Sequence, residues 1–334
     1  MLFGKKILII MPKYYGYEYY IQEVFTKLGA EVYLIYENID FINYFYRFVY
    51  VYMKQYKTQF QKLYYERKLK QITKDIDVVF VIRGSSLNND ILEMMKRDFS
   101  KAEFIMYQWD SVKNNIGCLN ISQYFEKIFT FDKNDAKKFG WQYRPLFYVN
   151  ELCCERKKYL ERSIDVTYIG LLHSQRAKMM CILKEIEKNS NLKFYFYLYL
   201  QYIVMIKHKY FQKDIELREI KKSDIEYREL SVEKTNEIYK NSKIIFDYTH
   251  PEQEGFTMRT IESIGHECKI ITNNIRIKNA DFYNENNVYI YENDKIEIPK
   301  SFLDKPYTKL SDELYYSYSL EGWVKEILGE EICC

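Results

Sequence analysis

Short apolar runs alternate with amphipathic stretches along most of the chain. Each run has the length of a buried parallel strand, and the stretch after it has helical spacing of its apolar residues. A strand, a loop, a helix and a second strand in succession predict a Rossmann-like α/β unit. In the first half the strands predicted in this way are Lys6–Met11, Glu31–Tyr36, Asp77–Ile82, Glu103–Tyr107 and Lys127–Phe131.

The same alternation starts again at Asp165, after a segment that contains Pro145 and the charged run Glu155–Arg162. We interpret that segment as the crossing between two domains, residues 1–150 and 151–334. A final helical region, Lys309–Leu328, is placed to cross back onto the first domain. The strands predicted in the second half are Asp165–Ile169, Lys193–Leu200, Ile244–Phe246, Lys269–Thr272 and Asn287–Tyr291.

The most informative stretch is residues 244–274, which reads as a strand, a polar loop, a helix and a second strand. Glu254 lies in the loop, and Arg259 and Glu262 lie one turn apart on the helix. The N–H groups of Phe256–Met258 point out of the helix N-terminus and can bind an anion. These parts suit a nucleoside diphosphate, with Arg259 on the diphosphate and Glu262 on the ribose hydroxyls.

Further candidates for that ligand precede the loop and follow the first strand of the second half. His250 can donate a hydrogen bond to a phosphate or a sugar. Gly170, His173 and Arg176 occupy the first strand-to-helix turn, the usual phosphate turn of such a domain. Gly170 permits close approach of the backbone. The alternative is that His173 and Arg176 are ordinary loop residues.

In the first half, Asp110 follows the strand Glu103–Tyr107. It is therefore expected at the carboxyl edge of the sheet, where ligands of open α/β sheets bind. Asp110 could position or deprotonate an acceptor hydroxyl. Equally, it could cap the next segment, because aspartate is a favoured N-cap.

The segment Phe41–Ile72 combines aromatic residues at helical spacing with seven basic residues and one acid, Glu66. A basic amphipathic helix suits an anionic membrane surface. The alternative is a helix that packs on the core and exposes a basic face to solvent.

Composition narrows the class of protein. The 334 residues suit two domains, and the net charge of +3 does not indicate nucleic-acid binding. The seven cysteines lack metal-site spacing and indicate reduced thiols. No signal peptide or run long enough to span a membrane is visible. We expect a cytoplasmic protein, able to lie against the inner face of the cell membrane.

The stretch around Glu254 and Glu262 resembles a known signature. Glu254-x7-Glu262, followed by Gly265 and a strand ending in Thr-Asn, resembles the E-x7-E motif of retaining GT-B glycosyltransferases. The sequence HPEQEGFTMRTIES–KIITNN is similar to that of bacterial capsule and lipopolysaccharide glycosyltransferases of the CgeB-like type. One departure is Thr257, where E-x7-E enzymes have the second glycine of Gly-Phe-Gly.

This resemblance implies the GT-B fold, two Rossmann-like α/β domains facing a central cleft, with the nucleotide sugar against the C-terminal domain. It implies metal-independent transfer of a sugar to a glycan or lipid-linked glycan in cell-surface polysaccharide synthesis, with retention of configuration. Glu254 would contact the sugar, and no cofactor is expected. The D-x-D spacing at Asp75 and Asp77 precedes a strand, and we interpret it as a turn rather than a metal motif.

The candidate residues follow from the spacing and the resemblance together. The catalytic candidates are Glu254, Arg259, His250 and Asp110, and the donor-binding candidates are Gly170, His173, Arg176, Gly255, Phe256, Thr257, Met258 and Glu262. Two alternatives stay open: a nucleotide-sugar 2-epimerase of the same fold, and a non-catalytic surface or spore-coat assembly protein.

Overall fold

The computed structural model describes residues 2–37, 56–171, 174–200, 224–249, 254–292 and 295–329. The chain forms two compact units. The first contains residues 2–145 and 324–329, and the second contains residues 146–323. Within the first unit, Arg144 Nε lies 3.1 Å from Glu326 Oε2, which ties residues after 323 to the end of the N-terminal sheet.

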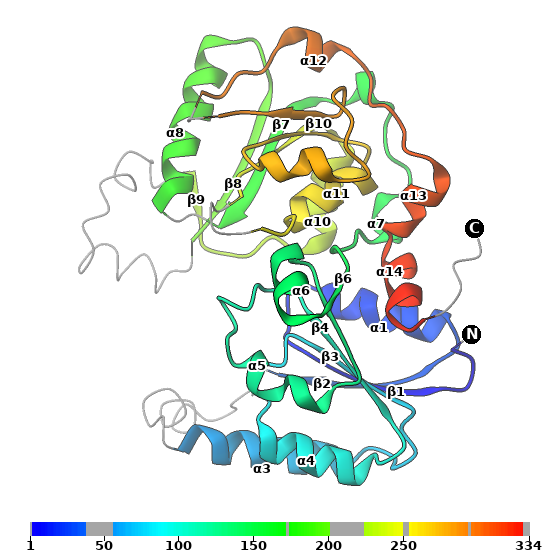
Figure 1. Ribbon diagram of the computed structural model, residues 1–334. Helices are drawn as coiled ribbons and strands as arrows, with labels where there is room; N and C mark the ends of the chain where they lie inside the picture. Colours follow the sequence, from blue (N-terminus) through cyan, green and yellow to red (C-terminus); the bar gives the residue numbers. More distant parts are fainter. Residues whose placement is uncertain are drawn as a thin grey trace. The chain divides into compact units, whose positions relative to one another are not determined.

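The first unit is a parallel sheet with helices between successive strands (Figure 1). The order of strands across the sheet is β2-β1-β3-β4-β5-β6. Its elements are β1 Lys6–Met11, α1 Tyr17–Lys27, β2 Glu31–Tyr36, α3 Lys57–Leu69, β3 Val78–Ile82, α4 Asn89–Asp98, β4 Glu103–Gln108, α5 Cys118–Ile121, β5 Lys127–Thr130, α6 Lys133–Phe139 and β6 Gln142–Tyr143.

The strand order reverses between β1 and β3, because β2 lies on one side of β1 and β3 on the other. Such a switch point leaves a crevice at the carboxyl ends of the two strands. Two pairs of residues with positive φ lie there. Tyr15 and Gly16 follow β1 with φ of 55° and 99°, and Arg83 and Gly84 follow β3 with φ of 75° and 70°.

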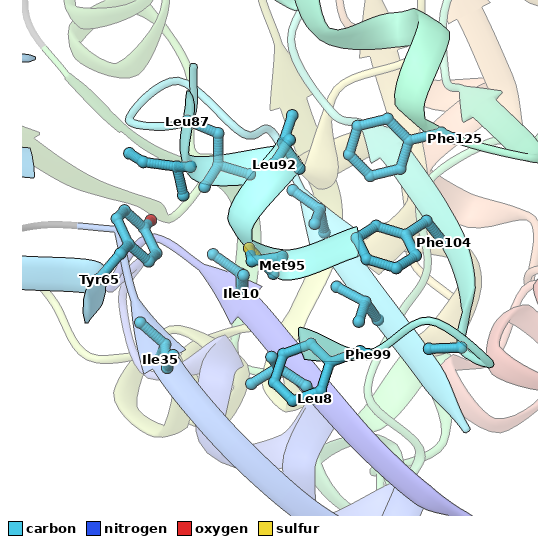
Figure 2. Packing of buried hydrophobic residues seen from close by; sticks show 14 of the residues in the cluster. Leu8, Ile10, Ile35, Tyr65, Leu87, Leu92, Met95, Phe99, Phe104 and Phe125 are labelled. Atoms are coloured by element: carbon cyan, nitrogen blue, oxygen red, sulfur yellow. The ribbon is translucent and has the colours of Figure 1, made fainter. Parts of the chain in front are cut away.

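The core of the first unit follows from alternation along its strands. Leu8 and Ile10 point from β1 toward the face covered by α4 (Figure 2). Met95 of α4 and Phe99, the residue that caps its C-terminus, pack against them there. The ring of Phe80 of β3 instead contacts that of Phe25 of α1, with 5.7 Å between their centroids, so α1 covers the opposite face. Both faces of the sheet are therefore buried, as its nearly continuous apolar strands predict.

The second unit repeats this plan, with the strand order β12-β11-β10-β7-β8-β9 and all pairs parallel. Its elements are α7 Asn150–Cys153, β7 Ile164–Leu171, α8 Ser174–Asn189, β8 Phe194–Tyr199, β9 Ile225–Glu226, α10 Val232–Lys240, β10 Ser242–Asp247, α11 Met258–Gly265, β11 Lys269–Thr272, β12 Val288–Ile290, α12 Lys300–Asp304, α13 Asp312–Ser317 and the start of α14 Leu320–Ile327, whose residues from 324 on belong to the first unit. The switch point lies between β7 and β10.

Alternation along β10 divides the core of the second unit. Ile244 and Phe246 pack with Met180 of α8 on one face of the sheet. Ile245 packs with Tyr239 of α10 on the other. The strand β10 is thus buried on both sides and fixes the position of the polar segment that follows it.

Gly265, the last residue of α11, packs where no side chain fits. A Cβ at this position would lie 2.6 Å from Tyr148 Cγ and 2.6 Å from Cys153 Sγ. The small residue that follows the Glu-x7-Glu spacing therefore has a packing role here. It lets α11 approach α7 and the segment that precedes it.

Two expectations from the sequence differ from the structure in detail. The final helical region is two helices, because Tyr148 pairs with Ser319 and Tyr148 N–H donates to Tyr318 O between α13 and α14. The first sheet gains the two-residue edge strand β6, and the second gains β9. In the described parts of the chain, no helix is long and apolar enough to cross a membrane.

Candidate functional site

The carboxylate of Asp247 is the centre of a polar cluster at the end of β10. Asp247 is fully buried. Its Oδ1 accepts a hydrogen bond from Arg259 Nε at 2.9 Å. Its other partners are four threonine hydroxyls, those of Thr249, Thr257, Thr260 and Thr272. A buried carboxylate with this many donors is well compensated, and it holds the ends of β10, α11 and β11 together.

Arg259 extends back from the first turn of α11 into this cluster. Besides Asp247, it donates to Ile169 O at 3.2 Å and to Tyr248 O at 3.3 Å. Burial lowers the pKa of Arg259, but Asp247, Tyr168 and Tyr239 together outweigh burial, so the pKa is raised. The arginine stays charged and joins β7, β10 and α11. Its side chain therefore holds these elements together at the switch point.

Arg176 lies beside this framework, in the first turn of α8. Its Nη1 donates to Leu171 O at 3.1 Å, whereas its buried Nε has no hydrogen-bond partner among the described residues. Burial lowers the pKa of Arg176; Arg259 lowers it further, and Tyr168 and Asp247 oppose that change. Two guanidinium groups therefore converge near one carboxylate, which leaves positive charge at this edge of the sheet.

Tyr168 and Gly170 complete this part of the site. Tyr168 is 1% exposed, and its hydroxyl has no hydrogen-bond partner within the described parts of the chain. Its ring lies 5.6 Å from the Arg259 guanidinium. A Cβ at Gly170 would meet Tyr168 Oη at 3.0 Å and Arg259 Nη1 at 3.2 Å, so glycine keeps the end of β7 open toward these groups. The orphaned hydroxyl of Tyr168 thus lies beside Gly170, and Arg176, with its orphaned Nε, bonds to the carbonyl of the next residue, Leu171.

The loop before α11 is held by its own contacts. Glu254 forms an ion pair with Arg276. Gly255 is buried, and Phe256 packs edge-on against Phe282 at 5.4 Å. These contacts fix the direction in which the chain enters α11.

Thr257, which replaces the second glycine of Gly-Phe-Gly, has a defined task. It is the N-cap of α11: its Oγ1 accepts from Thr260 N–H at 3.2 Å and donates to Asp247 Oδ1 at 2.9 Å. Its φ of −72° needs no glycine. Met258 is the first helical residue and is half-buried. The threonine hydroxyl thus links the helix cap to the buried carboxylate.

Glu262 lies in the second turn of α11 and is buried. Burial first, and then the charge of Glu262, raises the pKa of both Cys153 and Tyr239. The carboxylate therefore lies near these two side chains, and its assignment to a ribose stays a prediction. His250 and His173 lie outside the described residues.

In the first unit, Asp110 lies at the carboxyl edge, where the sequence predicts it. It does not cap a described helix; its Oδ2 lies 3.1 Å from Arg83 Nε. Burial raises the pKa of Asp110, and Arg83 opposes the change. Tyr14, on the loop after β1, contacts the ring of Trp109 at 5.1 Å. An ion pair and two aromatic rings therefore gather at this edge.

Several of these residues were not singled out from the sequence. Asp247 is the last residue of the buried strand β10, and Glu37 in the first unit comes directly after β2, so each lies at the carboxyl end of a strand, which is a signal that sequence alone offers. Arg276 and Tyr168 carry no such signal, because their partners depend on the tertiary fold. Among the described residues, no group of three or more metal-ligating side chains comes together. Metal independence stays a prediction.

No protein-family model and no curated protein sequence matches the chain. Its structure is similar to that of an alpha-glucosyltransferase in complex with UDP and a 13-mer DNA containing an A:G mismatch. That similarity has a TM-score of 0.53 and 13% sequence identity, over 80% of this chain and 79% of the other. Together with the two parallel sheets, it confirms the predicted fold class, two Rossmann-like α/β domains of the GT-B type.

Two other structures resemble the chain less closely. One is the apo form of the lipopolysaccharide outer core galactosyltransferase WaaB, with a TM-score of 0.49 and 12% identity over 97% of this chain and 99% of the other. The other is a putative UDP-N-acetylglucosamine 2-epimerase from Listeria monocytogenes, with a TM-score of 0.45 and 8% identity over 86% and 84%. We draw no functional conclusion from either.

Proposed function

We propose that the chain is a glycosyltransferase that binds a nucleotide-diphosphate sugar at the switch point between β7 and β10. The observation that carries this proposal is a pair of guanidinium groups at the end of β7: Arg259 lies beside Gly170, and Arg176 bonds to Leu171 O. The hydroxyl of Tyr168 and the Nε of Arg176 lack partners among the described residues. Buried donors without partners are costly, and a diphosphate would satisfy them.

The chemistry assigns different tasks to the two arginines. Sugar transfer places negative charge on the departing diphosphate, and donors aimed at that charge lower the barrier. Arg176 contacts the diphosphate. Arg259 keeps its bonds to Asp247 and the strand ends, and it acts through its charge and by holding α11 in place. N–H groups of Gly255–Met258 add donors at the helix terminus.

The remaining donor contacts follow the resemblance. Glu254, held by Arg276, contacts the sugar, and Glu262 binds the ribose hydroxyls. His173 and His250 donate to the phosphates or the sugar. Reaction without a metal and with retention of configuration belongs to this proposal. The acceptor is a glycan or a lipid-linked glycan of a cell-surface polysaccharide, such as capsule or lipopolysaccharide, and Asp110 binds its reacting hydroxyl.

A membrane partner is also part of the proposal. Of the segment Phe41–Ile72, residues 56–72 are described, and they include α3. This helix buries Gln61, Tyr65 and Leu69 against the core. Its other side exposes a basic surface, Lys57, Lys62, Arg67 and Lys68. The described part of the segment therefore includes a helix packed on the core. Its exposed basic surface suits an anionic membrane that carries a lipid-linked acceptor.

One experiment separates the proposed activity from its two rivals. The purified protein is incubated with nucleotide sugars, with and without glycan or lipid-linked acceptors, and nucleotide release is measured with the sugar product. Release of nucleoside diphosphate that depends on acceptor supports the transferase. Epimerised donor without any acceptor would favour a 2-epimerase. Binding of nucleotide without consumption would favour an assembly protein that keeps the fold.

A further inference from the structure

The turn after β3 has an unusual backbone conformation. Arg83 and Gly84 both have left-handed φ, 75° and 70°. For a residue as large as arginine this conformation is disfavoured, and it persists only where the surroundings impose it. The turn lies at the switch point of the first unit, next to β1.

Backbone and amide contacts fix Arg83 from the side of β4. Its N–H donates to Tyr107 O at 2.9 Å. Its carbonyl oxygen accepts from Gln108 Nε2 at 2.8 Å and from Asn115 Nδ2 at 2.9 Å. Both polar groups of the Arg83 backbone are therefore occupied, and the peptide cannot rotate without breaking bonds in a buried region.

A buried carboxylate holds the turn from the other side. Glu37 follows β2 and is 2% exposed. Its Oε2 accepts from Ser85 Oγ at 2.9 Å. Its Oε1 has no hydrogen-bond partner within the described parts of the chain. Glu37 thus bonds to Ser85, two residues after Arg83.

The result of these contacts is the placement of the Arg83 side chain. Its Nε lies 3.1 Å from Asp110 Oδ2, and each of the two side chains is 38% exposed. The pair is thus accessible, although the backbone of the turn that carries Arg83 is bonded on both sides. A carboxylate that accepts a hydroxyl proton, next to a guanidinium that donates to a neighbouring oxygen, can bind two adjacent oxygens of a sugar.

We propose that Glu37 is a positioning residue that holds the Arg83–Ser85 turn, so that Arg83 and Asp110 together bind the hydroxyl-bearing acceptor. This inference rests on the proposed transferase function, and it adds Arg83 as the acceptor contact and Glu37 as its support. Glu37 itself does not touch the acceptor. The carboxylate acts through the hydroxyl of Ser85, to which it is bonded.

The test compares two variants of Glu37 with a matched control. Glu37→Leu removes the hydrogen bond to the turn, whereas Glu37→Gln keeps an oxygen that can accept from the Ser85 hydroxyl. The control is Glu103→Gln, because Glu103 lies on β4 and pairs with Lys127 at 2.9 Å, at the start of its strand. If Glu37→Leu does not fold, Ser85→Ala, which deletes only the hydroxyl contact, takes its place.

Two readouts are measured on each variant, steady-state kinetics and amide hydrogen exchange over residues 83–88. We expect Glu37→Leu to raise the acceptor KM about tenfold or more, with the donor KM changed less than about twofold. Exchange at residues 84 and 85 becomes faster. Glu37→Gln restores most of both properties, and Glu103→Gln changes neither.

The possible outcomes distinguish a failure of this inference from a failure of the proposed transferase function. Unchanged exchange in Glu37→Leu would show that the carboxylate does not hold the turn. Faster exchange with an unchanged acceptor KM would show that the turn does not serve the acceptor. Either result overturns the inference while transferase activity stands. A wild-type protein that consumes no donor would instead overturn the proposed function, and the acceptor role with it.

Discussion

Arg259 Nε and Asp247 Oδ1 lie 2.9 Å apart in a pair that solvent does not reach from the Asp247 side. The pair joins the first turn of α11 to the end of β10. Through Ile169 O it also reaches β7, on the other side of the switch point. Arg259, whose charge is expected to face a ligand, therefore also has a structural role. In this respect its role differs from that of Arg176.

Removal of one partner of this pair should destabilise the fold. Arg259→Ala leaves the carboxylate of Asp247 buried with threonine hydroxyls alone, and we expect a loss of roughly 3–5 kcal/mol in the free energy of unfolding. Urea denaturation measures it. The control is Arg228→Ala, since Arg228 is exposed. Equal stability of the two variants would show that the pair contributes nothing to the fold.

Gly265 gives a second test of the framework. A methyl group there meets Tyr148 and Cys153 at 2.6 Å. Gly265→Ala should therefore lower the free energy of unfolding by roughly 1–3 kcal/mol, because the core must shift to accept it. Gly117→Ala is the matched control, because no atom lies within 4 Å of a Cβ at that position. A neutral Gly265→Ala would contradict the close packing of α11 on α7.

Glu37 should make stability depend on pH. Burial raises its pKa from 4.5 to about 7, against the opposing effects of Ser85 and Arg83. Between these values the native state binds more protons than the unfolded chain, so stability falls as the pH rises. The contribution of the protonated carboxyl is complete below about pH 4.5 and is lost as the pH rises through about 7.

The amount follows from the shift and can be isolated with one variant. At about 1.4 kcal/mol for each pH unit, the loss is roughly 3 kcal/mol. Glu37→Gln has no such proton, so the difference in unfolding free energy between wild type and variant should change with pH by that order. Chemical denaturation at a series of pH values measures it. A constant difference from pH 5 to about 8 would contradict a raised pKa.

The exposed basic surface of α3 predicts electrostatic binding to membranes. Lys62→Glu combined with Arg67→Glu should weaken sedimentation with vesicles of about 30% anionic lipid by roughly tenfold or more. Added salt should weaken wild-type binding as well. The matched control is Lys188→Glu at the end of α8. Equal sedimentation of both variants would contradict the proposed binding of α3 to an anionic membrane.

The sequence predicts the framework of both units well. Buried parallel strands are apolar throughout, so runs such as Ile244–Phe246 are recognised without tertiary information. The cap of α11 could also be predicted from the sequence, because Thr257 precedes an apolar helical pattern. Edge strands of two residues, such as β6, leave no such pattern, since they are defined by their partner alone.

The candidate site was predicted in its location more than in its contacts. The motif pointed to the first turn of α11, and the structure places Arg259 and Arg176 at one switch point. The motif did not indicate that Arg259 turns inward to Asp247, or that Glu254 pairs with Arg276, 22 positions away. Hydrogen bonds between distant loops depend on strand order and register, which local spacing does not encode.

The most direct test of the account is nucleotide binding by wild type and by Arg176→Ala. Thermal shift with a panel of UDP, GDP, ADP, CMP and TDP and their sugars identifies the donor. At about 100 times its Kd, a ligand adds roughly 2.7 kcal/mol of stability. We predict that one nucleotide family stabilises wild type and Arg228→Ala equally and Arg176→Ala much less. Equal stabilisation of Arg176→Ala, or no stabilisation of wild type at millimolar concentrations, would contradict a donor site between β7 and β10.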